Sequence, residues 1–463
     1  MRILASRCTA VFAGLIWIAL AALGADPAVH IPDPNLEAAL REALDKPAGD
    51  IATADIAGLT KLYAPGRDIE DLTGLEHAVK LKELVLTDNR IADLSPLAGL
   101  AQLESLSLGS NRVTDLSPLS GLKRLRVLEA MFNQIEDLSP LAGLSELTHL
   151  TLNNNRIRDV GPLSGLEKLE WLDLMFNEVT DLAPLAQLGR LKWLFLNSNN
   201  VFDLAPLAGL TSLRWLWLDM NGVMDISPVA GLRELRWLSL SVNAVSDIRP
   251  LAELTKLEKL DLSHNQIRDL VPLANLTGLR TLILLGNGVR DLSPLAGLTE
   301  LRYLDLGGNQ VSDLSPLAGL TRLEVLGISM NTVRDISPLA GLTNLTKLVA
   351  VGNRISDLTP LAGFKKLRTL NLQGNQIRTI TPLNELVALR DLFLGGNEVA
   401  DITPLSGLSH LELLDLSGNP VRTFGVLLKL PALRWVNVGG ILLGPEAREV
   451  LAQLEAQGVL VIR

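Results

Sequence analysis

The stretch "LRWLWLDMNGVMDISPVAGL", residues 213–232, decides the fold because its pattern returns every 22 residues. Sixteen asparagines, from Asn89 to Asn419, follow one another at this spacing without a gap. The position five residues before each asparagine is always leucine, and the position three before it is leucine or isoleucine except at Ala130 and Ala350. Self-similarity at a fixed period of this length indicates a repeat array.

Each unit reads L-x-x-L-x-L-x-x-N-x-I-x-D-L-S-P-L-A-G-L-x-x, and each part of it has a physical reason. The alternating "LxL" predicts a short strand with its leucines on one face. The asparagine can bond backbone groups of its own and the next coil, where buried polar backbone needs partners. The segment "DLSPLAGL" predicts an Asx-type turn and then a short helical turn, with serine at the cap, proline first and glycine at the end.

The aspartate of that segment recurs from Asp93 to Asp401, with Thr379 as the one exception inside this range. Such a column invites a metal-binding interpretation, but every member occupies the same turn, so we interpret these aspartates as turn caps. The five histidines share no metal-ligand spacing, and the sequence contains no nucleophile elbow, phosphate-binding loop or zinc motif. We therefore predict a protein that is not an enzyme and that uses no cofactor and no metal.

One coil cannot bury its leucines alone, so the coils must stack and share a core. The unit resembles the leucine-rich repeat family in its short 22-residue class, and particularly the internalin-like bacterial proteins. The resemblance covers about residues 59–441. It implies an α/β repeat solenoid: a curved leucine-rich repeat array with a parallel β-sheet on the concave face and short helical turns on the convex face. It also implies a binding surface rather than an enzyme.

Both ends depart from the repeat, as capping requires. The N-terminal segment "DPNLEAALREAL", residues 33–44, predicts a helix with Asp33 as its cap. The face expected to cover the first coil consists of Leu36, Ala39, Leu40 and Ala43. At the far end, residues 444–458 predict a helix and residues 459–462 a closing strand.

The resulting organisation has four parts. They are a signal peptide (1–24), a helical N-terminal cap (25–58), leucine-rich repeats (59–441) and a C-terminal cap (442–463).

The N-terminus has the pattern of a secretory signal peptide. Arg2 and Arg7 supply the positive charge that precedes an apolar run over residues 8–25. Small residues near the end of this run allow cleavage after Gly24. We therefore expect a secreted, periplasmic or cell-surface protein. The run is 18 residues long, near the lower limit for a membrane-spanning helix, so an uncleaved membrane anchor is the alternative. The single cysteine, Cys8, lies in this segment, and cleavage would leave a chain without disulfides.

The net charge of the chain indicates which kinds of partner it can bind. The net charge of −9 and pI of about 5.3 argue against nucleic-acid binding, which usually requires a basic stripe. They are compatible with a basic partner.

Information specific to this protein lies in the columns that the repeat leaves free, which are six, four, two and one residues before the asparagine. The first two flank a core leucine and must therefore point to the concave face. Four consecutive coils carry tryptophan at the first of these columns: Trp171, Trp193, Trp215 and Trp237. Neighbouring strands place equivalent side chains about 5 Å apart, so a continuous ladder of rings is expected.

The same four columns are rich in carboxylates. Nine acids stand against two lysines, Lys259 and Lys347, which predicts an acidic concave face with an aromatic centre. The nine are Glu83, Asp88, Glu129, Asp173, Asp219, Asp261, Asp305, Asp391 and Asp415.

Two interpretations of the rings compete. Stacked aromatic side chains stabilise a sheet, but this does not explain why the ladder ends after Trp237 while the repeats continue. Binding is the preferred interpretation, because exposed apolar patches and tryptophans mark contact sites. The candidate ligand-binding residues are Trp171, Asp173, Phe176, Trp193, Phe195, Asn197, Trp215, Trp217, Asp219, Met220 and Trp237.

We predict a non-catalytic recognition or adhesion module whose partner is a protein with a basic and apolar surface. A carbohydrate ligand on the same tryptophans is the alternative, and a purely structural envelope role is the third possibility.

Overall fold

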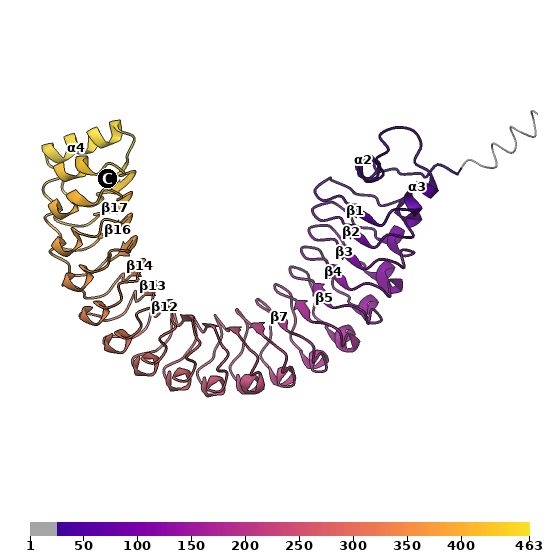
Figure 1. The fold of residues 1–463 in the computed structure, drawn as a ribbon, viewed down its shortest axis with the longest axis horizontal. Helices are drawn as coiled ribbons and strands as arrows, with labels where there is room; N and C mark the ends of the chain where they lie inside the picture. The colour runs from indigo at the N-terminus through magenta and orange to yellow at the C-terminus, as the bar shows by residue number, and fades with distance from the viewer. Residues whose placement is uncertain (1–25) are drawn as a thin grey trace, which may run out of the picture. The chain divides into compact units, whose positions relative to one another are not determined.

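The computed structural model describes residues 26–463, so the predicted signal peptide and Cys8 lie outside the described residues. The chain divides into two compact units, the first ending at Val179 and the second running from Thr180 to Arg463. Each unit is a stack of coils. Within each unit taken by itself, the strands lie on the concave side and the turns on the convex side (Figure 1).

Each repeat contributes one three-residue strand, and within each unit successive strands pair in parallel in the order of the sequence. The pairing register equals the repeat length, so Leu84 lies beside Leu106 and Leu106 beside Leu128. The strands of the first unit are β1 (Lys61–Tyr63), β2 (Glu83–Val85), β3 (Ser105–Ser107), β4 (Val127–Glu129), β5 (His149–Thr151) and β6 (Trp171–Asp173).

The second unit continues the same arrangement to the C-terminus. Its strands are β7 (Trp193–Phe195), β8 (Trp215–Trp217), β9 (Trp237–Ser239), β10 (Lys259–Asp261), β11 (Thr281–Ile283), β12 (Tyr303–Asp305), β13 (Val325–Gly327), β14 (Lys347–Val349), β15 (Thr369–Asn371), β16 (Asp391–Phe393), β17 (Leu413–Asp415), β18 (Trp435–Asn437) and β19 (Leu460–Ile462).

The core of each unit is a column of leucines. The middle residue of every repeat strand, such as Leu216, is buried, and so are the apolar residues three and eight positions before each asparagine, such as Leu218 and Leu213. Each buried leucine side chain contributes roughly 1.5–3 kcal/mol to folding through removal of apolar surface from water. The predicted solenoid is confirmed, and one coil is stable only against its neighbours.

The aspartates of the "DLSPLAGL" segments cap turns, as predicted. Asp93 Oδ1 accepts a hydrogen bond from the backbone N–H of Ser95 at 2.8 Å, and the Ser95 hydroxyl donates to Asp93 Oδ2. The convex turns are 3₁₀ helices, such as η2 (Ser95–Leu97), with proline in the first turn. Serine is the first residue of this helix and not its cap, because the aspartate two residues earlier already satisfies the free N–H.

The asparagine ladder is confirmed with one correction of direction. Asn111 Nδ2 donates to the carbonyls of Leu108 and Gly109 in its own coil and to Leu86 in the preceding coil. Its Oδ1 accepts from the N–H of Ile91, also in the preceding coil. The side chain thus reaches back to the coil before it, not to the next one.

The N-terminal cap is helix α2 (Pro34–Ala43), which begins at the predicted cap residue Asp33. Asp33 Oδ1 accepts from backbone N–H groups at the start of the helix, and Oδ2 accepts from Glu70 and Asp71 of the first coil at 2.7 and 3.1 Å. Burial by itself raises the pKa of Asp33, but these four donors outweigh burial and hold the pKa below its usual value. One carboxylate therefore joins the cap helix to the array.

The predicted buried face of α2 is correct for Leu36, Ala39 and Leu40, whereas Ala43 is exposed. Ala43 is the last residue of the helix, where the chain turns away from the first coil.

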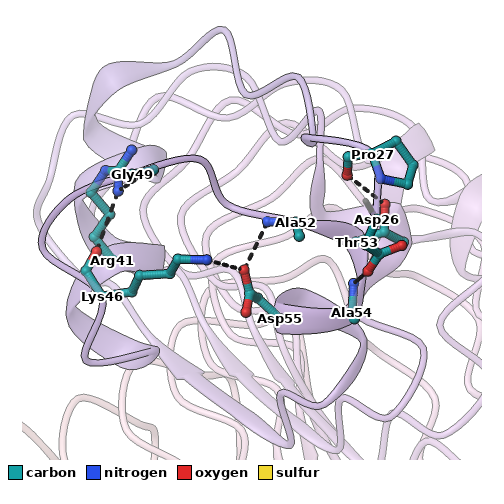
Figure 2. Close-up of polar contacts among 9 residues, drawn as sticks. All are labelled: Asp26, Pro27, Arg41, Lys46, Gly49, Ala52, Thr53, Ala54 and Asp55. Carbon is teal, nitrogen blue, oxygen red and sulfur yellow. Dashed lines mark hydrogen bonds and ion pairs between the residues drawn. The ribbon is translucent and has the colours of Figure 1, made fainter. Parts of the chain in front are cut away.

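A second, short helix, α3 (Thr53–Ala57), follows α2 (Figure 1), and Figure 2 shows the polar contacts around it. Asp55 Oδ2 accepts from the N–H of Ala52 at 2.8 Å and pairs with Lys46 Nζ at 2.5 Å. These contacts close the loop between the two helices.

The C-terminal cap agrees closely with its prediction. Helix α4 (Pro445–Ala456) packs beside the 3₁₀ helix η17 (Gly425–Lys429), and β19 adds in parallel to β18. The helix buries Val450, Leu451 and Leu454 over the last coil.

Candidate functional site

The concave face consists of the residues on either side of the buried leucine of each strand. In β8, Leu216 is fully buried while Trp215 and Trp217 on either side are half-buried and point outward. The parallel register places residues of one column next to each other, as with Trp193 and Trp215. The predicted orientation of the variable columns is therefore confirmed.

Four rings of the second unit contact one another, and we name them the aromatic cluster: Phe195, Trp215, Trp217 and Trp237. Trp217 is central: its ring centroid lies 4.9 Å from that of Phe195 and 4.7 Å from that of Trp237, both in edge-to-face geometry. The centroids of Trp215 and Trp237 are 5.3 Å apart with planes inclined by 59°. The Trp215–Trp237 contact lies within the predicted ladder, and the contacts of Trp217 add the neighbouring column to it.

A lysine closes this cluster at its C-terminal side. The ammonium of Lys259, on β10, lies 4.3 Å from the ring centroid of Trp237. A cation held over an aromatic face is attracted by the ring quadrupole. The column that carries the tryptophans thus continues into a lysine whose ammonium lies over the last ring of the run.

Burial changes the expected role of two candidate residues. Phe195 is only 3% exposed, because the edge of the Trp217 ring packs on it, and Asp173 is only 5% exposed. These two side chains therefore leave little surface for direct contact with a ligand. Trp171 and Trp193 are half-buried, as are Trp215, Trp217 and Trp237.

The most exposed candidates lie one residue before the asparagine. Phe176 and Met220 are 52% and 57% exposed, and both have positive φ angles, 54° and 55°. The left-handed conformation suits glycine and asparagine and costs other residues roughly 1–2 kcal/mol. From Gly352 onward every coil carries glycine at this position, so the bulky residues of the earlier coils are not required by the turn.

The carboxylate of Asp219 is hydrogen-bonded inside the protein. Its Oδ1 accepts from the Ser239 hydroxyl and the N–H of Ser241 at 2.7 Å, and its Oδ2 accepts from Asn197 Nδ2 at 2.8 Å. Burial raises the pKa of Asp219 despite these donors, and the nearby Asp261 adds to the rise.

Asp173 lies in the first unit in a similar setting. It accepts from Asn153 Nδ2 at 2.6 Å and from the N–H of Met175 at 3.0 Å, and burial raises its pKa. The acids at 173 and 219 therefore hold neighbouring coils together. The concave face presents fewer free carboxylates than the sequence count predicts.

A basic border runs beside this face, one residue before the first variable column. It includes Arg214, Arg236 and Arg302, and these arginines are exposed. Arg236 pairs with Glu258 and Arg302 with Glu324, both at 2.8 Å, on the next coils. Exposed pairs of this kind contribute little stability, so they set the surface charge rather than the fold.

A recess on the second unit was missed by reasoning from the sequence. A hollow of about 370 Å³ opens over β11 to β14, and we name it the glycine-floored hollow. Its defining residues are Tyr303, Asp305, Gly307, Val325, Gly327 and Lys347. The sequence does contain a sign of this hollow, because glycine occurs here in two columns that carry larger side chains in other coils. The segment 307–309 reads as ordinary scaffold when only the fixed columns are considered.

Two observations bear on metals and membranes. Within residues 26–463, no three histidine, cysteine, aspartate or glutamate side chains gather as a possible metal site. In the same described part of the chain, no helix has the length and apolar character needed to cross a membrane.

Comparison with known proteins gives the family. The model of tandem leucine-rich repeats matches residues 101–143, 145–187, 343–385 and a set of overlapping segments between 233 and 341, together about half of the chain. The sequence matches none of the curated proteins with which it was compared.

Solved structures agree. An internalin from Listeria monocytogenes is 35% identical, covers 73% of this chain and 94% of its own, and superposes with a TM-score of 0.62. The functional domain of a second Listeria internalin, which includes a cysteine ladder, is 24% identical over 81% of this chain and 83% of its own, with a TM-score of 0.72. This chain has a single cysteine, so nothing in it corresponds to that ladder.

A plant peptide hormone receptor in complex with its peptide is similar in fold. It is 24% identical over 84% of this chain and 68% of its own, with a TM-score of 0.69. Proteins of the leucine-rich repeat type are generally protein-binding and adhesion modules. The 22-residue coil, the asparagine ladder, the matched family segments and the 35% identical internalin together identify the chain as a member of the leucine-rich repeat family, of the internalin-like bacterial type.

Proposed function

We propose that this protein is a non-catalytic recognition module that binds a protein partner on its concave face. The observation that carries the proposal is the exposure of large apolar side chains, Phe176 and Met220, in a backbone conformation that disfavours them. Strain of this kind is retained where a side chain has a use beyond folding. Exposed apolar side chains are typical of contact sites.

The rings beside Met220 support the same proposal. Trp193, Trp215, Trp217 and Trp237 are half-buried, so each leaves part of its surface to solvent. Half-exposed tryptophans held firmly by their neighbours bind with little loss of side-chain entropy. The peptide-bound plant receptor uses a similar fold to hold a peptide, which also favours a protein or peptide partner.

A carbohydrate ligand receives less support from the ring geometry. Sugars stack on open ring faces, whereas the planes of Trp215 and Trp237 are inclined by 59° and Lys259 lies over Trp237. A purely structural envelope role remains the third alternative, because the same ring contacts stabilise the sheet. The predicted signal peptide supports a secreted, periplasmic or cell-surface location.

The sharpest test removes apolar surface without harming the fold. In Phe176→Gly and Met220→Gly, glycine adopts the positive φ without strain, so the free energy of unfolding should be unchanged or slightly higher. Binding should nevertheless fall. The measurement is a pull-down from the protein's native environment at low and high salt, with thermal unfolding of each variant measured in parallel.

Matched controls exist in the same column. Ser110 and Ser198 also have a φ of 55°, so Ser110→Gly and Ser198→Gly change the backbone equally but remove no apolar surface. These controls should retain the partner. Retention by the Phe176 and Met220 variants as well would refute the proposed surface, and binding that is insensitive to salt would favour a glycan.

A further inference from the structure

The glycine-floored hollow has its shape because two side chains are absent. Gly307 and Gly327 do not have positive φ angles, so their backbone could hold any residue. In the column of Gly327 other coils carry Ser107, Trp217 and Ser239. A Cβ at Gly327 would lie 2.7 Å from Asp305 Oδ1. Glycine there leaves room for the Asp305 carboxylate, which would have to move aside for a larger residue, and it is not required by the backbone conformation.

Asp305 stands at the floor of the hollow with unused capacity for hydrogen bonds. Its Oδ1 accepts from the N–H of Gly307 at 2.9 Å. Among residues 26–463, no group donates to Oδ2, in contrast to the Asp219 carboxylate, both of whose oxygens are engaged. Asp305 is half-buried, so a charged donor arriving from a partner would meet it partly shielded from water.

Tyr303 forms the wall next to this carboxylate. Its ring is half-buried, and burial, together with the charges of Asp305 and Asp261, raises the pKa of the Tyr303 hydroxyl. The ring therefore lies within the field of two carboxylates, which favours a cation near its face.

Lys347 lies on the opposite side of the hollow. Its side chain is exposed, and within the described part of the chain it makes no ion pair. It is two strands away from Asp305 and displaced by one column, because Asp305 pairs with Gly327 and Val325 pairs with Lys347. Strand spacing and rise put their α-carbons about 12 Å apart. The hollow thus has a negative end, a positive end and an apolar middle.

We propose that the glycine-floored hollow binds an arginine residue that ends a polypeptide chain. Its guanidinium pairs with Asp305 and stacks on Tyr303, its aliphatic stem lies over Val325, and its terminal carboxylate pairs with Lys347. The inference rests on the proposed function, since it names one anchor of a protein partner. It uses none of the residues tested there.

The chemistry favours arginine over other residues. A guanidinium presents a planar fork of donors that matches a carboxylate and stacks on an aromatic ring, whereas an ammonium is a compact and strongly hydrated charge. An acidic side chain would be repelled by Asp305. Charges of both signs at the two ends disfavour a ligand that carries only one sign.

The two tyrosines of the chain allow binding to be observed directly. Protein labelled at its tyrosine rings is titrated with Nα-acetyl-arginine and followed by NMR, with Tyr303→Phe used to assign the two signals. Saturable shifts are expected for Tyr303 and not for Tyr63, with a dissociation constant on the order of 1 mM for a ligand of this size. Failure of Tyr303 to shift up to the solubility limit would overturn the proposal.

Two matched ligands, each lacking one charge of Nα-acetyl-arginine, test the roles of Asp305 and Lys347 separately. Nα-acetyl-citrulline, which has the same shape without the positive charge, should bind at least about tenfold more weakly. Nα-acetyl-arginine amide, which lacks the carboxylate, should lose about two- to fivefold, as expected for an exposed ion pair. Equal binding of arginine and citrulline derivatives would refute the role of Asp305.

Variants of the protein should give the same pattern. Asp305→Asn should weaken Nα-acetyl-arginine at least about tenfold, while Asp391→Asn, which removes a charge from the same face four strands away, should change binding less than about twofold. Lys347→Met should abolish the difference between the acid and the amide. Gly327→Ser is compatible with the repeat, as Ser107 and Ser239 show, and should weaken all these ligands alike.

Failure of this proposal is distinguishable from failure of the proposed function. If Nα-acetyl-arginine does not bind but Phe176→Gly still loses the partner, only the hollow is refuted. If Nα-acetyl-arginine binds and Phe176→Gly retains the partner, only the apolar surface is refuted.

Discussion

Strands β7 to β9 and strands β12 to β14 belong to the same unit and place the same two columns on the concave face. In the first group these columns carry Trp193, Trp215, Trp237, Phe195, Trp217 and Ser239. In the second they carry Tyr303, Val325, Lys347, Asp305, Gly327 and Val349. The leucines beneath are buried equally in both, so the scaffold does not distinguish them.

What differs is the space above the scaffold. Large rings fill the columns of the aromatic cluster and cover one another, as the 4.7 Å and 4.9 Å contacts of Trp217 show. In the second group Gly327 leaves one position of these columns without a side chain, and a hollow opens there with a carboxylate, a phenol and an ammonium around it. Large aromatic side chains thus strengthen the sheet at one place, and missing side chains create a recess at another.

The largest expected difference is in stability. Trp217→Ala should lower the free energy of unfolding by about 3 kcal/mol, because it removes the ring on which Phe195 and Trp237 pack. Tyr303→Ala, at a wall of the hollow with no such ring contact among the described residues, should cost about 1 kcal/mol or less. Urea unfolding followed by circular dichroism measures both, and equal losses would contradict the distinction.

The second difference concerns two kinds of glycine. Gly308 has a φ of 61°, and a Cβ there would lie 3.3 Å from the N atom of Gly286, so Gly308→Ala should cost about 1–2 kcal/mol. Gly327→Ser has an ordinary φ and requires only the Asp305 carboxylate to move, so it should cost less than about 0.5 kcal/mol. Thermal unfolding of the two variants decides between glycine used for conformation and glycine used for space.

The third difference concerns how the free energy of unfolding depends on pH. The pKa of Asp219, ordinarily near 3.8, is raised by burial, so its contribution to stability is complete below pH 3.8 and is lost as the pH rises through the raised value. The unfolding free energy of wild type minus that of Asp219→Asn should therefore decrease from pH 3.5 to pH 7, by about 1.4 kcal/mol per unit of pKa shift. A difference that grows with pH would show that the hydrogen bonds outweigh burial.

The smallest expected effect is at the lysine that closes the cluster. Lys259→Met keeps the stem but removes the charge over Trp237, and should lower stability by about 0.5–1 kcal/mol. High salt should reduce this difference very little, because the ammonium is in direct contact with the ring. Lys347→Met, whose ammonium contacts no ring among the described residues, is the control and should leave stability unchanged.

The fold could be predicted almost completely because each fixed column has one mechanical role. Leucine spacing gives the strands, Asp93 and its equivalents give the turns, and Asp33 with Pro34 gives the first helix. The direction of the asparagine bonds could not be predicted, since the side chain is equally close in sequence to both neighbouring coils. It depends on how the coils are tilted in the stack.

The candidate site was less predictable, because exposure depends on neighbours 22 residues away. Phe195 and Trp217 occupy the same column, yet the first is buried by the second. Asp173 and Asp305 also share a column, but Asn153 donates to the first and leaves it little surface. Counting residue types in a column identifies the face. It does not show which side chains cover or hydrogen-bond one another and therefore leave little surface for a ligand.

The backward reach of the asparagines also governs how the array grows. A ribosome releases the N-terminus first, and each coil lacks the side chain that satisfies its backbone until the following 22 residues have emerged. Each asparagine therefore completes the hydrogen bonds of the coil that was released before it. In a nascent chain only the last coil still lacks these hydrogen bonds, however many coils precede it. The surface open to misfolding during synthesis therefore does not increase with the length of the array.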